Sequence, residues 1–313
     1  MTDYVRNGLT RRDPVSLNKE QIRAFNPLHW PLAIRLPERH HGLVASAWIG
    51  HVPFAMCLVE MVSPTVVVEL GTHSGVSYCG FCQAVKELRL QTQCWAVDTW
   101  AGDDHAGVYS TEVLDELRSH HDPRYALFST LLKSTFDSAV EEFADDSIDI
   151  LHIDGYHSYE AVQHDFQTWL PKVSERGVVL FHDTEVRDRE SFGVWRFWDE
   201  IKQHYPHFEF QHSHGLGVLA VGEQVPAGVE SLTGASAGEA DRIRVYFAEL
   251  GHTLAHMQSL AMELEAKRRR WVIMWEKDGT SRAHDVLAGN LRRYVSAPAT
   301  TLFAGLRKRL VRS

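Results

Sequence analysis

Acidic and imidazole side chains follow two apolar runs of the sequence, where they could bind a cation and move a proton. Asp154 and His157 come after IDILHI, and His182 and Asp183 end GVVLFHD. Parallel strands place their carboxyl ends at one edge of a sheet, so we expect Asp154 and Asp183 to lie together. Two unpaired carboxylates in contact repel each other, and a divalent cation between them removes the repulsion. His182 could add a ligand; alternatively, Asp154 closes an Asx turn and Asp183 caps the next turn.

A glycine turn earlier in the chain could hold a nucleotide-like cofactor. ELGTHSG follows the β-branched run TVVV, and Gly71 and Gly75 tolerate backbone angles that let main-chain N–H groups approach a ligand. Asp98 ends the next apolar run, where a carboxylate can accept hydrogen bonds from ribose hydroxyls. The middle glycine of a dinucleotide-binding turn is missing. The alternative is a plain strand-to-helix turn, with Asp98 as an exposed strand-end acid.

These residues lie in an alternation of short apolar runs and amphipathic segments, which is typical of a parallel, doubly wound α/β sheet. Ligands of such sheets bind at the carboxyl ends of the strands. The expected strands are 65–70, 94–98, 125–132, 148–154 and 177–183, followed by a closing pair in HFEFQH and GLGVLAVG. The expected helices are 41–61, bent or restarted at Pro53, and 75–90, 113–121, 136–143, 158–170 and 194–205.

The composition is that of a globular protein with an acidic body and a basic end. The chain has 313 residues, 44% hydrophobic and 23% charged, with a net charge of −9. Residues 267–313 carry twelve Lys and Arg against three acids, a net of +9, which leaves −18 on residues 1–266. An acidic body argues against nucleic acid as the main partner. Because we find no signal peptide and no apolar run of membrane-spanning length, we expect a cytoplasmic protein.

We assign no chemical role to the cysteines or to the remaining histidines. Cys79 and Cys82 lack a second pair that would complete a zinc site, and we expect them to be buried on a helix. The other histidine groups lack acids at metal-ligand spacing. We expect these histidines at the surface: His40, His41, His120, His121, His204, His207, His212 and His214.

Four regions are expected along the chain. They are an irregular N-terminal extension at 1–40, the α/β domain at 41–222, a turn-rich linker at 223–240 and a helical region with a basic tail at 241–313. The spacing of apolar residues in the last region indicates a helical hairpin or a coiled coil, through which the chain could form a homodimer. The final TLFAGLRKRLVRS could contact an anionic membrane surface weakly, which would place the protein at the inner face of a membrane.

Four segments together resemble one enzyme family. ELGTHSG, WAVDTWAGD, DILHIDGYHSYEAVQHDF and RGVVLFHDT are similar to segments of class I S-adenosylmethionine-dependent methyltransferases. Within that family the chain resembles the metal-assisted group that includes macrolide-sugar O-methyltransferases and cephalosporin-pathway methyltransferases. The resemblance covers about residues 45–222. It implies a Rossmann-like, seven-stranded sheet with a helical C-terminal extension.

The resemblance also implies a role for each residue of the site. S-adenosylmethionine would lie over the glycine turn, Mg²⁺ would be the ion, and His157 would be the general base, with Asp154 beside it in catalysis. The implied donor contacts are Glu69, Gly71, Thr72, Gly75 and Asp98, and the implied metal ligands are Asp154, His182 and Asp183. Related enzymes carry an acid at the position of His182, and an imidazole there favours a softer divalent ion.

We therefore expect an S-adenosylmethionine-dependent O-methyltransferase that acts on a hydroxyl of a sugar, glycoconjugate or related small molecule, as in polysaccharide biosynthesis. A bound cation stabilises an alkoxide, and a histidine of near-neutral pKa can take the proton. One alternative is an NAD-dependent oxidoreductase on a Rossmann sheet, which the missing glycine disfavours. The other is a non-catalytic methyltransferase-like scaffold in a glycoconjugate biosynthesis assembly, which the histidine at position 182 keeps open.

Overall fold

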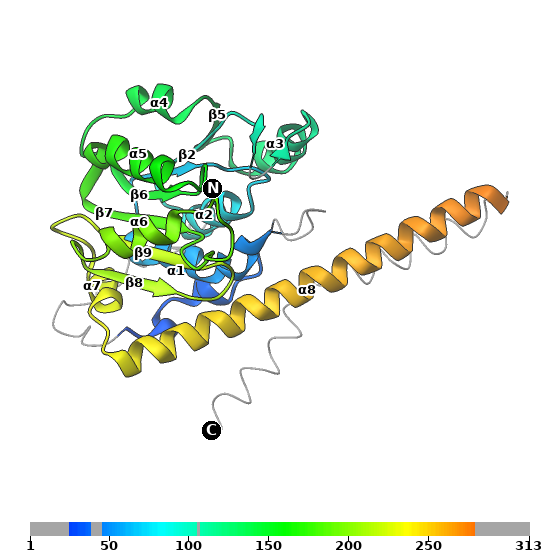
Figure 1. Cartoon of the computed structure of the whole chain (residues 1–313). Helices are drawn as coiled ribbons and strands as arrows, with labels where there is room; N and C mark the ends of the chain where they lie inside the picture. Colours follow the sequence, from blue (N-terminus) through cyan, green and yellow to red (C-terminus); the bar gives the residue numbers. More distant parts are fainter. Residues whose placement is uncertain (1–24, 39–45, 105–106, 279–313) are drawn as a thin grey trace, which may run out of the picture. The chain divides into compact units, whose positions relative to one another are not determined.

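A mixed seven-stranded sheet is the centre of the fold (Figure 1). The computed structural model describes residues 25–38, 46–104 and 107–278. The strands of the sheet are β1 (Val66–Leu70), β2 (Gln93–Asp98), β5 (Ser129–Lys133), β6 (Ile148–Ile153), β7 (Val173–His182), β8 (His207–Phe210) and β9 (Leu216–Ala220), and β3 (Gly102–Asp103) pairs separately with β4 (Gly107–Val108). Their order is β5-β2-β1-β6-β7-β9-β8; the first five are parallel, and β9 is antiparallel to both of its neighbours. The expected seven-stranded α/β fold is confirmed.

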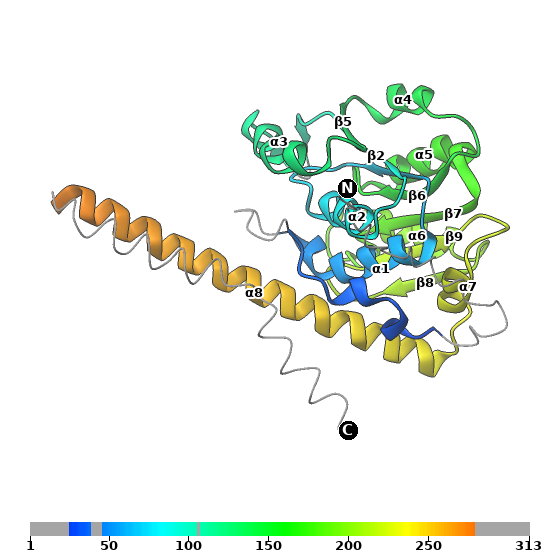
Figure 2. The same ribbon diagram turned by 180° about the vertical axis from the view of Figure 1, so that it is seen from behind.

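Helices cover both faces of the sheet (Figures 1 and 2). The described helices are α1 (Val52–Val62), α2 (Val76–Leu88), α3 (Glu112–Tyr125), α4 (Phe136–Ala139), α5 (Tyr159–Trp169), α6 (Val194–Ile201), α7 (Ala227–Thr233) and α8 (Ala237–Asp278), with 3₁₀ turns at Pro27–His29, Pro31–Ile34, Ala47–Gly50, Val140–Glu142 and Leu170–Lys172. Successive residues of a strand face opposite sides. Accordingly, Val67 packs in one apolar cluster with α1 and α2, whereas Val68 packs in another with α5 and α6. The sheet is doubly wound, and its strands are apolar because both faces are buried.

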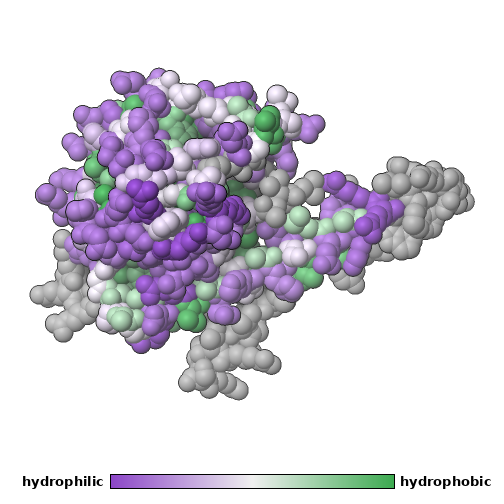
Figure 3. Space-filling view, viewed as in Figure 1, coloured by the Kyte–Doolittle hydropathy of each residue, from purple (hydrophilic) through white to green (hydrophobic). Residues whose placement is uncertain are grey.

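Charged residues are the exception in this interior. The outer face of the domain in Figure 3 is mostly hydrophilic, whereas apolar side chains fill the two clusters on either side of the sheet. Several ionisable residues are nevertheless buried near the carboxyl ends of the strands: Glu69, Asp98, His152, His182 and Asp183. Buried ionisable groups are rare unless they are paired, and they often mark functional sites.

The strand order reverses between β1 and β6. From β1 the sheet continues to β2 and β5 on one side, and to β6 and β7 on the other. The turns that follow β1 and β6 lie next to each other, because Asp154 N donates to Leu70 O at 2.9 Å. On the other side, Gly71 N donates to Val97 O of β2 at 2.9 Å. Ligands of open α/β sheets bind beyond the carboxyl ends of the strands at such a reversal.

The stretch before α1 packs against the domain, which differs from the irregular extension expected up to residue 40. Leu32 and Ala33 are buried, and Leu32 N donates to the Glu60 carboxylate of α1 at 3.1 Å. Burial of apolar side chains compensates for ordering this segment. Residues 1–24 lie outside the described part of the chain.

Local details mostly follow the sequence pattern, with one strand shortened. Pro53 stands in the first turn of α1, directly after a 3₁₀ turn, so the expected helix restart is confirmed. The expected strand at 125–132 is wrong in its first half, because α3 continues to Tyr125 and β5 begins at Ser129. An aromatic core residue such as Tyr125 fits a helix end as well as a strand, so the short apolar run was ambiguous. The cysteines are free and buried: Cys57, Cys79, Cys82 and Cys94.

The C-terminal region contains more helix than expected. Within the stretch expected to be a linker, α7 buries Val229 and Leu232, and this burial explains why it is helical. The long α8 is one continuous helix and not a hairpin. A division into two compact units falls within α8, after Gln258. None of the described helices is long and apolar enough to cross a bilayer. The region boundaries, the coiled coil and the homodimer stay predictions, and the basic tail from residue 279 lies outside the described residues.

Candidate active site

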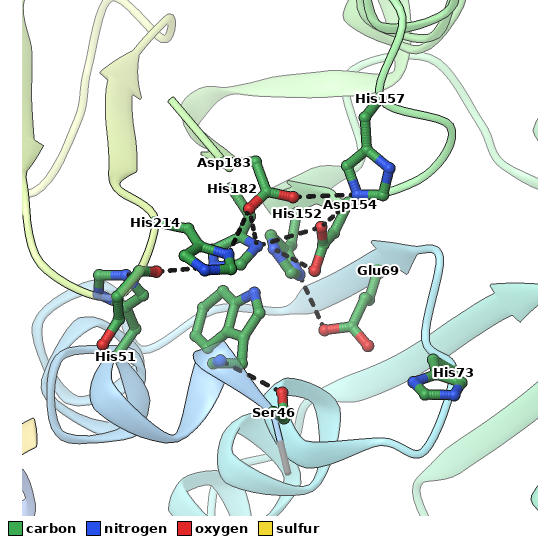
Figure 4. Close-up of polar contacts among 12 residues, drawn as sticks. Ser46, His51, Glu69, His73, His152, Asp154, His157, His182, Asp183 and His214 are labelled. Carbon is green, nitrogen blue, oxygen red and sulfur yellow. Dashed lines mark hydrogen bonds and ion pairs between the residues drawn. The ribbon is translucent and has the colours of Figure 1, made fainter. Parts of the chain in front are cut away.

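Asp154, His182 and Asp183 meet at the carboxyl edge of the sheet (Figure 4). Among the described residues they form a group that could hold a metal ion, with one ligand atom from each residue and all three atoms within 4.8 Å of one another. His182 Nδ1 lies 3.3 Å from Asp154 Oδ1 and 3.5 Å from Asp183 Oδ1. The predicted proximity of the two carboxylates is confirmed, whereas their role as ligands stays a proposal.

The backbones of β6 and β7 bring these residues together. The two strands are parallel neighbours with Ile153 opposite Phe181, so the residues that follow each strand end lie side by side. Asp183 has a left-handed backbone conformation with φ +62°. This conformation is unfavourable for a residue with a side chain and persists where the surroundings enforce it. The strain therefore falls on a carboxylate of the candidate site.

His157, in the loop between β6 and α5, points at both carboxylates. Its Nε2 lies 3.0 Å from Asp183 Oδ2 and 3.9 Å from Asp154 Oδ1. The ring stacks on Phe192 with 4.5 Å between centroids and 9° between planes. The main-chain O of His157 accepts a hydrogen bond from Gly193 N at 2.7 Å. These contacts hold the imidazole in one orientation, as a positioned proton acceptor requires.

A further histidine, His214, reaches the site from the turn between β8 and β9. Its side chain is 46% exposed, as expected for a surface histidine, and its Nδ1 lies 3.1 Å from Asp183 Oδ1. Because β9 is antiparallel to β7, with Leu216 opposite His182, the turn before β9 returns to the carboxyl end of β7. No local sequence signal reveals this contact, since it depends on strand pairing.

Of the other histidines expected at the surface, His121 is buried and three are partly buried: His120, His207 and His212. His121 is only 1% exposed, and its Nε2 lies 2.7 Å from Ser129 Oγ. His212 is partly buried, and its Nε2 donates to Gly50 O at 3.2 Å. A buried imidazole needs hydrogen-bond partners, and these partners come from segments far away in the sequence.

The carboxylates and histidines of the site shift one another's pKa values. Burial lowers the pKa of His182, but the charges of Asp154 and Asp183 outweigh burial and raise it to about 10. Burial raises the pKa values of both aspartates, yet the charge of His182 outweighs it and holds both below their usual range. For His157, burial lowers the pKa and the hydrogen bond to Asp183 raises it, with a net rise. The ionised forms of the two carboxylates are therefore stabilised by positive charge beside them.

The donor atoms fit a divalent cation. His182 Nε2 lies 3.2 Å from Ser213 O, and because a carbonyl can only accept, this nitrogen carries a proton while Nδ1 faces the carboxylates. Metal-binding histidines commonly donate their other ring N–H to a carbonyl in this way. Two carboxylates with one imidazole suit Mn²⁺, Fe²⁺ or Zn²⁺ better than Mg²⁺, which prefers oxygen ligands.

The glycine turn lies directly beside these ligands. Gly71 and Gly75 have φ angles of +89° and +76°, which favour glycine. A side chain at Gly71 would collide with the main chain of Asp154. The turn leads into α2, and the first N–H groups of a helix have no intrahelical partner, so this helix end can bind an anionic group.

Asp98 shapes the glycine turn from the end of β2. Its Oδ2 accepts from His73 N at 2.8 Å, and its Oδ1 accepts from Trp100 N at 2.7 Å. Each carboxylate oxygen keeps a second lone pair that can accept from a ligand hydroxyl. Thr72 Oγ1 is buried and has no hydrogen-bond partner among the described residues, and a bound polar ligand could satisfy it.

Glu69, which is also expected to contact the donor, pairs with a histidine of β6. Its side chain is fully buried, and its Oε2 accepts from His152 Nδ1 at 2.8 Å. Glu69 and His152 lie opposite each other on β1 and β6. Directly opposite residues of neighbouring strands point to the same face, which explains the pair. His152 lies within an apolar run of the sequence, and no sequence pattern predicted that it belongs to the site.

Comparison with known proteins identifies a domain that includes these residues. Residues 68–184 match the model of a family described as a methyltransferase domain. An uncharacterized protein, y4gI, of Sinorhizobium fredii (strain NBRC 101917 / NGR234) is 47% identical over 201 residues, which are 64% of this chain and 22% of that protein. The chain thus spans about a fifth of the length of this curated relative.

Similar solved structures have low sequence identity to this chain. The SAH-bound Podospora anserina methyltransferase PaMTH1 is 12% identical, with a TM-score of 0.44, over 61% of this chain and 85% of its own. The O-methyltransferase TomG from Streptomyces achromogenes, in complex with SAM, is 13% identical, with a TM-score of 0.44, over 57% of this chain and 82% of its own.

Proposed function

We propose, from the premise that residues 68–184 form a methyltransferase domain, that this chain transfers a methyl group from S-adenosylmethionine to a hydroxyl oxygen. The observation that carries the proposal is the meeting of a glycine turn, two carboxylates and an oriented histidine where the strand order reverses. The acceptor that we propose is a sugar, a glycoconjugate or a related small molecule.

Residues after β1 and β2 would hold the methyl donor. The main chain at Gly71 and Gly75 can approach a ligand closely, and the start of α2 suits the carboxylate of the amino-acid part of S-adenosylmethionine. Thr72 Oγ1 offers an unsatisfied hydroxyl. Asp98 would accept hydrogen bonds from the ribose hydroxyls through its remaining lone pairs. Glu69 stays a proposed donor contact as well, although its side chain is buried.

Residues after β6 and β7 would prepare the acceptor. A divalent cation held by Asp154, His182 and Asp183 would polarise the acceptor hydroxyl and neutralise the carboxylates that raise the pKa of His157. His157 would accept the hydroxyl proton at Nε2, the atom that faces Asp183. Stacking on Phe192 keeps that atom in place. Methyl transfer then depends on holding the acceptor oxygen in line with the donor methyl.

An exposed aromatic residue in the loop after β6 supports a sugar-like acceptor. Tyr156 is 38% exposed and lies in the chain between Asp154 and His157. Binding sites for small molecules combine aromatic walls with a few polar groups that fix orientation. An exposed aromatic residue in the same loop as the proposed proton acceptor fits that composition.

Calorimetry with S-adenosylmethionine and with NAD, each with and without Mn²⁺ or Mg²⁺, tests the proposal. We expect S-adenosylmethionine to bind and NAD not to bind, and we expect methyl transfer to one member of a panel of sugars and glycolipids to require the cation. Asp154→Asn should weaken cation binding and leave donor binding intact. Binding of NAD alone would favour an oxidoreductase, and binding of neither would favour a scaffold; either result overturns the proposal.

A further inference from the structure

We infer that Arg189 selects an acceptor sugar that carries an anionic group, a carboxylate or a phosphate, in addition to the hydroxyl that is methylated. The inference rests on the proposed function and narrows its acceptor to sugar acids and sugar phosphates. Arg189 lies in the loop between β7 and α6, and no step of the proposed methyl transfer uses it.

Arg189 belongs to a stack of three side chains that begins at the proposed base. The His157 ring lies on Phe192, with 4.5 Å between centroids and 9° between planes. The guanidinium carbon of Arg189 lies 4.9 Å from the centroid of the same Phe192 ring. The guanidinium and the imidazole are therefore no more than two stacking distances apart. A monosaccharide with a charged substituent can span that separation.

The backbone holds the members of this stack together. Phe192 N donates to Arg189 O at 3.0 Å and closes a turn. The Phe192 side chain is buried, and the next residue, Gly193, donates its N–H to His157 O at 2.7 Å. The loop that carries Arg189 is thus tied to the loop that carries His157. The guanidinium is held beside the base before any ligand arrives, which lowers the ordering cost of binding.

A neighbouring arginine of the same loop shows what Arg189 lacks. Arg187 also lies over an aromatic ring, 4.9 Å from the centroid of Trp195, but its Nη1 lies 3.1 Å from a carboxylate oxygen of Asp199. Arg189 is exposed and forms no ion pair with any carboxylate in the described part of the chain. The positive charge next to the base is therefore open to a ligand, whereas the charge of Arg187 is already paired.

A guanidinium in this state recognises a particular kind of ligand. Its N–H groups form a planar fork that fits the two oxygens of a carboxylate or of a phosphate. Contact with an aromatic ring leaves those N–H groups able to donate to an anion. The chemistry at Arg189 therefore favours an acceptor with a carboxylate or a phosphate over a neutral sugar.

The anion would belong to the acceptor and not to the methyl donor. His157 and Phe192 follow β6 and β7, whereas the glycine turn proposed to hold the donor follows β1. In Figure 4, Asp154 lies between His157 and Glu69 of β1. Asp154 and Asp183 would repel an anionic group at the reacting end of the sugar. The charged substituent is thus expected at the other end of the sugar, where Arg189 would pair with it.

Binding of matched sugars to the purified full chain, loaded with S-adenosylhomocysteine, tests the inference by calorimetry. The probes are glucose, galactose and mannose, each as the neutral sugar, the uronic acid and the 6-phosphate. In at least one series we expect an anionic form to bind about tenfold more tightly than the neutral form, the usual gain from a hydrogen bond to a charged group. The uronic acid and 6-phosphate arms show which anion the site takes. Added NaCl should weaken only the binding of the anionic form.

Three substitutions separate a charge contact from a structural role. Arg189→Gln keeps most of the side-chain length and removes the charge, so it should bind anionic and neutral sugars within about twofold of each other. Arg189→Lys should keep most of the preference, because the charge remains. Arg187→Gln is the matched control from the same loop and should keep the full preference, since that arginine is already paired with Asp199. Donor affinity should be the same in all three variants.

The other outcomes contradict the inference in distinct ways. If the parent binds anionic and neutral sugars equally, or binds none of the probes, Arg189 does not select an anion. If Arg189→Gln weakens the binding of both forms equally, its role is structural. If Arg189→Gln weakens donor binding instead, the arginine serves the donor. Failure of the parent to bind S-adenosylmethionine would overturn the proposed function itself, whereas donor binding with sugar affinities that ignore charge would overturn only this inference.

Discussion

His157 Nε2 lies 3.0 Å from Asp183 Oδ2, so a histidine that follows β6 and a carboxylate that follows β7 form one hydrogen-bonded pair. The same carboxylate is 3.1 Å from His214 and 3.5 Å from His182 through its other oxygen. Asp183 is thus shared between the proposed proton acceptor and the proposed cation ligands. A substitution that alters cation binding should therefore also alter proton transfer, because both depend on Asp183.

Replacing the proposed base should slow the chemical step. We expect His157→Ala to lower kcat by about 10²- to 10⁴-fold, the usual contribution of a positioned acid or base. Donor affinity should be unchanged, since the donor turn lies after β1. His164→Ala, which removes an exposed histidine paired with Asp137, is the matched control and should keep full activity. A kcat for His157→Ala near that of the parent would show that another group takes the proton.

Removing His214 should weaken the cation site without abolishing it. Asp183 would lose one of its three histidine neighbours and some of its orientation. We expect about a tenfold loss of Mn²⁺ affinity, as for other outer partners of a metal ligand, and a larger loss for Asp183→Asn. His204→Ala, at an exposed position, serves as the control. Unchanged Mn²⁺ affinity and kcat in His214→Ala would mean that the contact contributes to neither cation binding nor catalysis.

Gly71 should tolerate no side chain, for reasons of both conformation and space. Its φ of +89° costs a residue with a Cβ about 1–2 kcal/mol, and that Cβ would also collide with the main chain of Asp154. Gly107 has a φ of +83° and open space around it, so Gly107→Ala carries only the conformational cost. We expect Gly71→Ala to lower the free energy of unfolding in urea by about 1–3 kcal/mol more than Gly107→Ala. Equal losses of unfolding free energy in the two variants would mean that the backbone conformation alone accounts for the effect and that the collision with Asp154 does not contribute.

The buried Asp165 of α5 should make stability depend on pH. Burial raises its pKa to about 7, above the 3.8 of an exposed aspartate. The folded state therefore binds the proton more tightly, and stability falls as pH rises from about 4 to 7. Asp165→Asn removes this dependence. At about 1.4 kcal/mol per pKa unit, its advantage over the parent in free energy of unfolding should grow by about 2–3 kcal/mol from pH 5 to pH 8. A constant difference between the two proteins would contradict the buried, protonated carboxyl.

Much of the fold could be read from local patterns. Each central strand is an apolar run because both of its faces are covered, and burial leaves that trace in the sequence. Tyr125 shows where the patterns fail, since its apolar neighbours fit a helix end and a strand equally. Helix α7 was missed because its burial depends on the packing of Val229 and Leu232 against distant segments.

By itself, the sequence determined that Asp154 and Asp183 would share one edge of the sheet, with the glycine turn and Asp98 at the same edge. This holds because parallel strands all end on the same side, so the order of elements is enough. Only the tertiary structure decided that His214 joins Asp183 and that Glu69 pairs with His152. Those contacts depend on which strands pair and in what register, and register joins residues that no local pattern connects.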